Sequence, residues 1–147
     1  MPAALLTLAF VAGFGITLQV GFNDALRGAL GTAGLATLVN FSVGIVALLA
    51  FVLAVRTPLP SREAIAGAPW WAWFGGMLGA FYVAAVTIAG PRLGATLLIA
   101  VTVLGQLVAA LLVDHYGWLG FAQQPVSLTR LAGCVLLLGG VLLVSRS

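Results

Sequence analysis

Five long apolar runs limit what this chain can fold into more than any other feature of its sequence. They lie near Ala3–Phe22, Gly31–Val55, Trp70–Ala89, Leu93–Val113 and Leu128–Val144. None of them contains Asp, Glu, Lys or His, and the one arginine within them, Arg130, stands close to an end. A helix needs about 20 apolar residues to cross the hydrocarbon of a bilayer, with a range of about 17 to 25. Each run is therefore a candidate membrane span.

The bilayer then decides the secondary structure of these runs. Hydrocarbon offers no water to the backbone, so a spanning segment must pair its own N–H and C=O groups, as a helix or in a closed barrel. Barrel strands alternate apolar and polar residues, and no run here alternates. The mean hydropathy of +1.21 is far above that of soluble domains. We expect an all-α, polytopic membrane protein with five transmembrane helices in a single domain over residues 1–147, the first run being retained rather than removed as a signal peptide.

The arginines are shared evenly between the two sides that five spans would create. One side would hold Arg56, Arg62 and Arg130, and the other Arg27, Arg92 and Arg146. Positive residues near helix ends normally set the orientation of a membrane protein, so this share favours neither orientation. We interpret it as dual topology, in which copies insert both ways and pair as an antiparallel homodimer. The alternative is chance, with the orientation fixed by other features.

Polar side chains within the spans mark a candidate substrate pathway. Gln19 and Asn23 are four residues apart and so lie along one stripe of a helix. An amide in hydrocarbon without a hydrogen-bond partner is costly, so such side chains should face inward. The candidate pathway residues are Gln19, Asn23, Asn40, Tyr82, Gln106 and Trp71. We expect them to line a shared polar cavity; the alternative is that they only hydrogen-bond between helices as structural glue.

Asp24 and Arg27 follow this stripe, three residues apart at the end of the first run. We expect them to form an ion pair at the rim and to mark the mouth of the pathway. No span carries an acid at its centre, so the exchange of a proton for a cation, which commonly needs a buried carboxylate, stays open but is not supported. Transport of a neutral, zwitterionic or anionic substrate is as open as the exchange of a proton for a cation. His115, beside Asp114, is expected to be solvated.

Small residues predict close packing of two of the helices. The third run contains two overlapping pairs with small-xxx-small spacing, and the last run contains glycines on a surface without polar residues in its interior. Such spacing lets helix backbones approach closely. The candidate packing residues are Gly75, Gly76, Gly79, Gly133 and Gly140.

The sequence lacks the residue patterns of an enzyme or of a cofactor site. It has no phosphate-binding glycine loop, no metal-ligand spacing among His115, the acids and Cys134, and no nucleophile–base pair. The basic excess of 6 against 3 acids suits anionic lipid headgroups better than nucleic acid. We expect no enzymatic activity, cofactor, metal or nucleic-acid partner. The expected partners are the lipid bilayer, a small-molecule substrate and a second copy in inverted orientation.

Several motifs occur in a fixed order along most of the chain. They are Q-x-x-x-N-x-x-L at Gln19, Asn23 and Leu26, NFSVG at Asn40–Gly44, WWAWFGGMLGAFYV at Trp70–Val83, PRLGAT at Pro91–Thr96, GQL at Gly105–Leu107, DHYG at Asp114–Gly117 and the terminal RLAG…GGVLLV. In order and spacing the chain resembles the YdcZ-like five-helix branch of the drug/metabolite transporter (DMT) superfamily. The resemblance implies an EamA-like half, a bacterial inner (cytoplasmic) membrane location and export. Relatives of this branch occur as dual-topology singles, as oppositely oriented pairs or as fused proteins.

The resemblance also bears on the site and the mechanism. It implies that Gln19 and Asn23 line the pathway. The chain lacks the acid that the small multidrug-resistance proteins of the same superfamily carry inside their first helix. We predict a secondary transporter that exports a small metabolite or drug-like molecule by alternating access in an antiparallel dimer. The alternatives are a small dual-topology ion channel and a non-transporting membrane assembly subunit, in which the amides would pair and leave no cavity.

Overall fold

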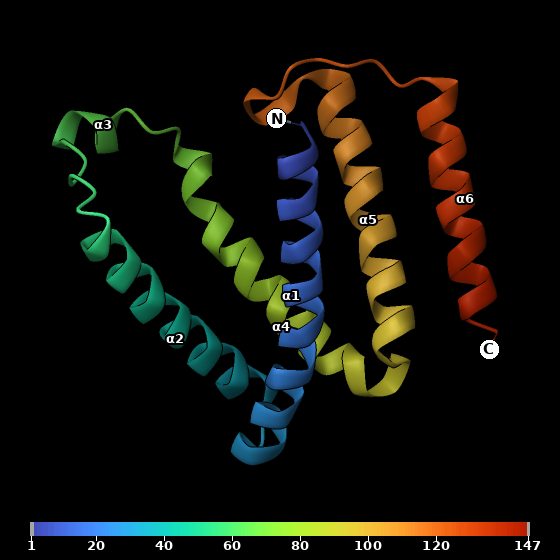
Figure 1. Ribbon diagram of the computed structural model, residues 1–147, viewed down its shortest axis with the longest axis horizontal. Helices are drawn as coiled ribbons and strands as arrows, with labels where there is room; N and C mark the ends of the chain where they lie inside the picture. The colour runs from blue at the N-terminus through green and yellow to red at the C-terminus, as the bar shows by residue number, and fades with distance from the viewer. Residues whose placement is uncertain (1, 147) are drawn as a thin grey trace. The chain divides into compact units, whose positions relative to one another are not determined.

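The computed structural model describes residues 2–146, which are helical except for short connections (Figure 1). The elements in chain order are α1 (Pro2–Leu30), α2 (Ala33–Ala54), α3 (Arg62–Ala66), the 3-10 helix η1 (Trp70–Phe74), α4 (Gly75–Leu93), α5 (Ala95–Tyr116), the 3-10 helix η2 (Trp118–Gly120) and α6 (Leu128–Val144). No strand occurs in this part of the chain, which confirms the all-α prediction.

Four stretches are helical, long enough and apolar enough to cross a bilayer: Ala3–Leu30, Ala33–Ala54, Trp70–Leu93 and Ala95–Tyr116. The chain is therefore a polytopic membrane protein. α6 is also apolar but has only 17 residues. At the helical rise of about 1.5 Å per residue it is about 25 Å long, against a hydrocarbon thickness of about 30 Å. The fifth span stays a prediction.

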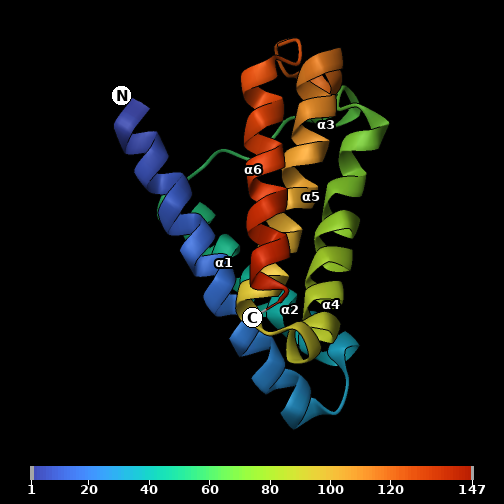
Figure 2. The same cartoon turned by 90° about the vertical axis from the view of Figure 1, so that its right-hand side faces the viewer.

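The helices form two compact units, of which the first ends at Pro91 and the second begins at Arg92. In the first unit, α1 and α2 pack against each other on either side of the short connection at Gly31 and Thr32. In the second unit, α5 and α6 lie side by side and run in opposite directions (Figure 2). The single transmembrane domain expected from the sequence stays a prediction.

The first helix is longer than the sequence predicts, because it continues past Phe22 to Leu30. The prediction ended the helix where polar residues begin, but polarity does not break a helix. Asp24 and Arg27, three residues apart, form an ion pair that suits the helical spacing. The helix ends where Gly31 adopts a φ of +85°, a backbone conformation that favours glycine.

The other helix ends also follow backbone chemistry rather than hydropathy. The third run begins as η1 after Pro69 and continues as α4 beyond the predicted end at Ala89. α5 extends to Tyr116 instead of Val113, because Gly117 closes it in the left-handed conformation and donates its N–H to the Val113 carbonyl. The bounds of α6 agree with the predicted 128–144.

Most large apolar side chains of the described residues point outward, as Phe10 at 76% and Leu136 at 77% exposure illustrate. In water such a surface would be a liability, whereas in hydrocarbon it is the solvent-facing surface. The buried residues are few: Val20, Ala36, Val83, Val86, Leu98 and Val141, with the polar Asn23, Thr37 and Thr87. Buried polar groups are thus a large part of the small interior, and they direct attention to the first unit.

Candidate functional site

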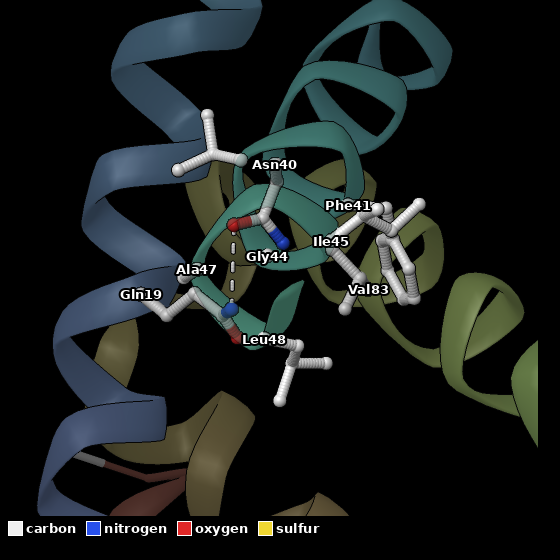
Figure 3. Close-up of a pocket in the computed structure, with 9 residues that line it drawn as sticks. Gln19, Asn40, Phe41, Gly44, Ile45, Ala47, Leu48 and Val83 are labelled. Carbon is white, nitrogen blue, oxygen red and sulfur yellow. Dashed lines mark hydrogen bonds between the residues drawn. The ribbon is translucent and has the colours of Figure 1, made fainter. Parts of the chain in front are cut away.

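Two amides from neighbouring helices meet in the first unit. Gln19 of α1 donates a hydrogen bond from Nε2 to Oδ1 of Asn40 on α2, with a donor–acceptor distance of 3.4 Å (Figure 3). Both side chains are partly buried. The bond is long for an N–H···O hydrogen bond, whose usual range is about 2.7 to 3.2 Å. It is therefore a weak link that a competing group can replace.

The amide pair stands at the edge of a pocket of about 350 Å³. Nine residues of α1, α2 and α4 line it: Gln19, Asn40, Phe41, Val43, Gly44, Ile45, Ala47, Leu48 and Val83. Seven of these residues are apolar and none is charged, so the two amides are its polar groups. Pockets that bind small molecules combine apolar walls with a few polar groups in this way.

Two glycines create the room for this pocket and for the packing around it. Gly44 follows Asn40 by one helical turn, and a Cβ built there would have nothing within 4 Å. On α4, a Cβ at Gly79 would lie 3.6 Å from the ring of Phe41, so α4 and this ring are already in contact distance there. The predicted packing role of Gly79 stays a prediction, because this contact is an ordinary van der Waals distance to a side chain.

Asn23 lies one turn beyond Gln19 on α1 and is the most unusual side chain of the unit. It is 1% exposed, and neither its Oδ1 nor its Nδ2 has a hydrogen-bond partner among the described residues. Buried polar groups are normally paired, because an unpaired one loses its hydrogen bonds to water without replacement. By contrast, the buried threonine of α2, Thr37, satisfies its hydroxyl by donating to the Ala33 carbonyl at 2.8 Å. Asn23 therefore stands out as an unused binding group.

The ion pair predicted after this stripe is confirmed, and its place at the rim stays a prediction. Arg27 donates from Nε and Nη2 to Oδ1 of Asp24, at 3.0 and 2.8 Å. The two side chains are 38% and 44% exposed, so this carboxylate is partly solvated and already paired. It is not a free acid within the apolar interior.

The remaining predicted pathway residues are not among those that line the pocket. Tyr82 is half-buried on α4, Trp71 is 41% exposed in η1, and Gln106 is exposed on α5 in the second unit. Among the predicted packing glycines, Gly75, Gly76, Gly133 and Gly140 are exposed, and a Cβ on any of them would meet nothing within 4 Å. The roles of these residues stay predictions.

The second unit contains a polar network that the sequence analysis missed. Arg130, at the start of α6, lies 3.3 Å from Oδ2 of Asp114 and also donates to the carbonyl and the side-chain oxygen of Gln124. His115 accepts a hydrogen bond at Nδ1 from the Val126 N–H at 3.3 Å, where the sequence predicted a merely solvated side chain. The network fixes the connection between α5 and α6. The sequence feature that could have indicated this network is Arg130, an arginine in the first turn of a mostly apolar helix.

The described residues contain no cluster of three or more His, Cys, Asp or Glu side chains that could hold a metal ion. Cys134 is a free, half-buried thiol on α6. The chemistry that the first unit offers is therefore hydrogen bonding within an apolar pocket.

Comparisons with known proteins agree with a membrane role. A family model described as "Putative inner membrane exporter, YdcZ" matches residues 4–143. The chain is similar to the inner membrane protein YdcZ of Escherichia coli strain K12, with 31% identity over 143 residues, which cover 96% of this chain and 95% of the relative. No solved structure matches the chain.

Proposed function

The chain belongs to the YdcZ family of inner-membrane proteins, and on that premise we propose that it is a carrier that exports a small molecule across the inner membrane. The proposed mechanism is alternating access, with the pocket between α1, α2 and α4 as the substrate site. The family description and the apolar helices support a multi-pass location in that membrane.

The burial of Asn23 without a hydrogen-bond partner is the observation that carries this proposal. Amides that serve as glue between helices pair with each other, as Gln19 and Asn40 do. Asn23 has no such pair in the part of the chain that the structure describes, so structural glue does not account for it. A group that is buried and unpaired in one state becomes useful if another state of the protein brings a ligand to it.

The order of the polar groups along α1 suits stepwise passage. Gln19 opens onto the pocket, Asn23 lies one turn further, and the Asp24–Arg27 pair lies just beyond it. A substrate would first hydrogen-bond to the amide groups that the Gln19–Asn40 bond leaves free and would then pass to Asn23. Carriers expose such a site to one side of the membrane at a time.

We further propose that the working unit is an antiparallel homodimer. The even share of arginines supports it, because neither orientation is favoured by charges near the helix ends. In such a dimer the inward-open and outward-open forms are the same structure seen from opposite sides. Their intrinsic free energies are then equal, and the substrate gradient sets the direction of net transport.

Cysteine labelling separates a carrier from an assembly subunit. In a Cys134→Ala background, Gly44→Cys places a thiol in the pocket and Ser42→Cys places a matched thiol on the same helix outside the pocket lining. A membrane-impermeant maleimide should modify the pocket thiol and spare the control. If neither thiol reacts in native vesicles, the pocket is sealed and the chain is a subunit without transport function.

Ion permeability separates a carrier from a channel. Liposomes that contain the purified protein should hold gradients of K⁺, Cl⁻ and F⁻ as well as protein-free liposomes do. Rapid dissipation of any of these gradients would assign channel function instead.

Labelling of the loop between α2 and α4 tests the dimer. Ser61→Cys in the Cys134→Ala background should react with an impermeant reagent in intact cells only in part, and the remainder should react after permeabilisation. Complete reaction from one side would show a single orientation and would exclude the antiparallel dimer.

A further inference from the structure

The hydrogen-bonding groups of the pocket are few and can be counted. Gln19 uses one Nε2–H and Asn40 uses one lone pair of Oδ1 in their mutual bond. This leaves the Gln19 Oε1 as a wholly unused acceptor and the Asn40 Nδ2 as a wholly unused donor group, and the second Nε2–H of Gln19 and the second lone pair of the Asn40 Oδ1 are also free. In Figure 3 the Asn40 oxygen faces Gln19, whereas its nitrogen lies toward Ile45 and Val83. Exchanging oxygen and nitrogen in both amides leaves the same inventory, which is one wholly unused acceptor, one wholly unused donor group and the two half-used groups of the mutual bond.

The pocket offers no charge to balance an ion. None of its nine lining residues is Asp, Glu, Arg, Lys or His. The acid next to Asn23 on the same helix, Asp24, is occupied by Arg27. Moving an ion from water into apolar surroundings costs more than two amide dipoles return, unless an opposite charge accompanies it. The pocket therefore discriminates against cations, anions and zwitterions.

The apolar walls and the volume of the pocket determine the character and size of the rest of the ligand. Phe41, Ile45, Leu48 and Val83 present apolar side chains around the amides. The volume of about 350 Å³ lies within the range of small-molecule pockets, about 300 to 1,000 Å³. A lipid tail would fit the walls but would leave the free donor and acceptor without partners in hydrocarbon, which is unfavourable.

We infer that the pocket binds an uncharged small molecule in which an apolar body carries one amide or hydroxyl group. The oxygen of that group accepts from Asn40, its hydrogen is donated to Gln19, and the apolar body lies against Phe41 and Val83. This inference rests on the proposed function for the statement that the ligand is transported. The inference narrows the substrate class, because the sequence leaves cationic, neutral, zwitterionic and anionic substrates open.

Three probes of nearly equal shape test the charge preference. Benzamide is neutral, benzamidinium is cationic and benzoate is anionic, and each joins one phenyl ring to a planar three-atom head. Binding of the labelled probes to the purified full chain is measured by equilibrium dialysis, with protein-free micelles subtracted. We expect benzamide to bind at least about tenfold more tightly than either ion, since a buried ion here lacks a counter-charge.

Variants then place the bound probe in the pocket. Gly44→Leu fills the open space beside Asn40, and Gly34→Leu is its matched control on α2, where a Cβ also meets nothing within 4 Å but the residue does not line the pocket. Asn40→Leu keeps the volume and removes the donor. Benzamide affinity should fall about tenfold or more in Gly44→Leu and Asn40→Leu and change less than about twofold in Gly34→Leu.

Several results would overturn the inference. Equal binding of the three probes would mean nonspecific occupation, as by lipid tails, and tighter binding of benzamidinium or benzoate would mean an ionic substrate. Undetectable benzamide binding would also refute the ligand class. A further overturning result is that Gly44→Leu dissociates a dimer, Gly34→Leu does not, and benzamide affinity is unchanged. In that case a second copy of the chain fills the pocket. In each case the maleimide reaction of the pocket thiol still decides separately whether the chain is a carrier.

Discussion

Asn23 follows Gln19 by one helical turn on α1, yet Gln19 has a hydrogen-bond partner on α2 and Asn23 has none within residues 2–146. The two amides have the same chemistry and the same helix, so the difference lies in their surroundings. Gln19 opens onto a pocket, whereas Asn23 is closed off at 1% exposure. This contrast is the basis of the first prediction.

Replacing Asn23 with leucine should stabilise the protein. The variant removes a buried and unpaired amide and keeps the volume, so the free energy of unfolding should rise by about 1 to 3 kcal/mol. Denaturant unfolding in micelles measures it, and Gln106→Leu, which changes an exposed amide, is the control with little effect. A loss of stability in Asn23→Leu would show that Asn23 has a structural partner in the folded protein.

The Asp24–Arg27 pair should contribute little to stability. Both side chains are more than one-third exposed, and exposed ion pairs contribute about 0 to 1 kcal/mol. A double-mutant cycle with Asp24→Asn and Arg27→Gln should therefore give a coupling free energy below about 1 kcal/mol. A much larger coupling would mean that the pair is buried in the working assembly, for example against a second copy.

Removal of Arg130 should loosen the connection between α5 and α6. The guanidinium holds Asp114 and Gln124 together, and Gln123 donates to the His115 carbonyl at 3.0 Å in the same network. Arg130→Gln should make chymotryptic cleavage near Phe121 several times faster in vesicles that expose this loop. Arg146→Gln, near the other end of α6, should leave the rate unchanged. Equal rates in the two variants would show that the loop is held by other contacts.

Glu63 provides a pH-dependent reporter outside the candidate spans. Hydrogen bonds from its own backbone N–H and then from the Ser61 hydroxyl lower the pKa of the Glu63 carboxyl. Because the folded pKa is depressed, the contribution of this carboxylate to α3 is present above the unfolded pKa and is lost as the pH falls through the lowered folded pKa. A carbon-13 NMR titration should therefore give a midpoint below that of an unstructured glutamate, and Ser61→Ala should raise it. An unchanged midpoint in Ser61→Ala would remove Ser61 as a cause.

Hydropathy predicted most of the fold because the bilayer imposes it. A run of apolar residues must be helical in hydrocarbon, and the last helix agrees with its predicted bounds, 128–144. The end of α1 was predicted wrongly, because Asn23, Asp24 and Arg27 are polar without being helix breakers, and the turn depends on Gly31. Helix ends follow backbone conformation more closely than they follow polarity.

The candidate site could be predicted only in part. The spacing of Gln19 and Asn23 identified a polar stripe, and burial of amides in hydrocarbon directed it inward. The apolar walls could not be predicted. In a membrane protein apolar side chains face the lipid as well as the interior, so hydropathy alone does not separate Phe41 and Val83 from lipid-facing residues. For the Asp114–Arg130 pair the sequence offered only the arginine in the first turn of the last helix, because the intervening loop folds back through Gly117 and Leu119, both at positive φ.

The unequal helix lengths have a consequence for the surrounding lipid. α1 has 29 residues and α6 has 17, which correspond to about 43 and 25 Å at about 1.5 Å per residue. A long span meets hydrophobic mismatch by tilting, and a short one by thinning the membrane around it. Acyl-chain length thus becomes a variable that acts on this protein. On the prediction that α6 is the fifth span, bilayers of short-chain phospholipids should reduce the mismatch at α6 while increasing the tilt of α1.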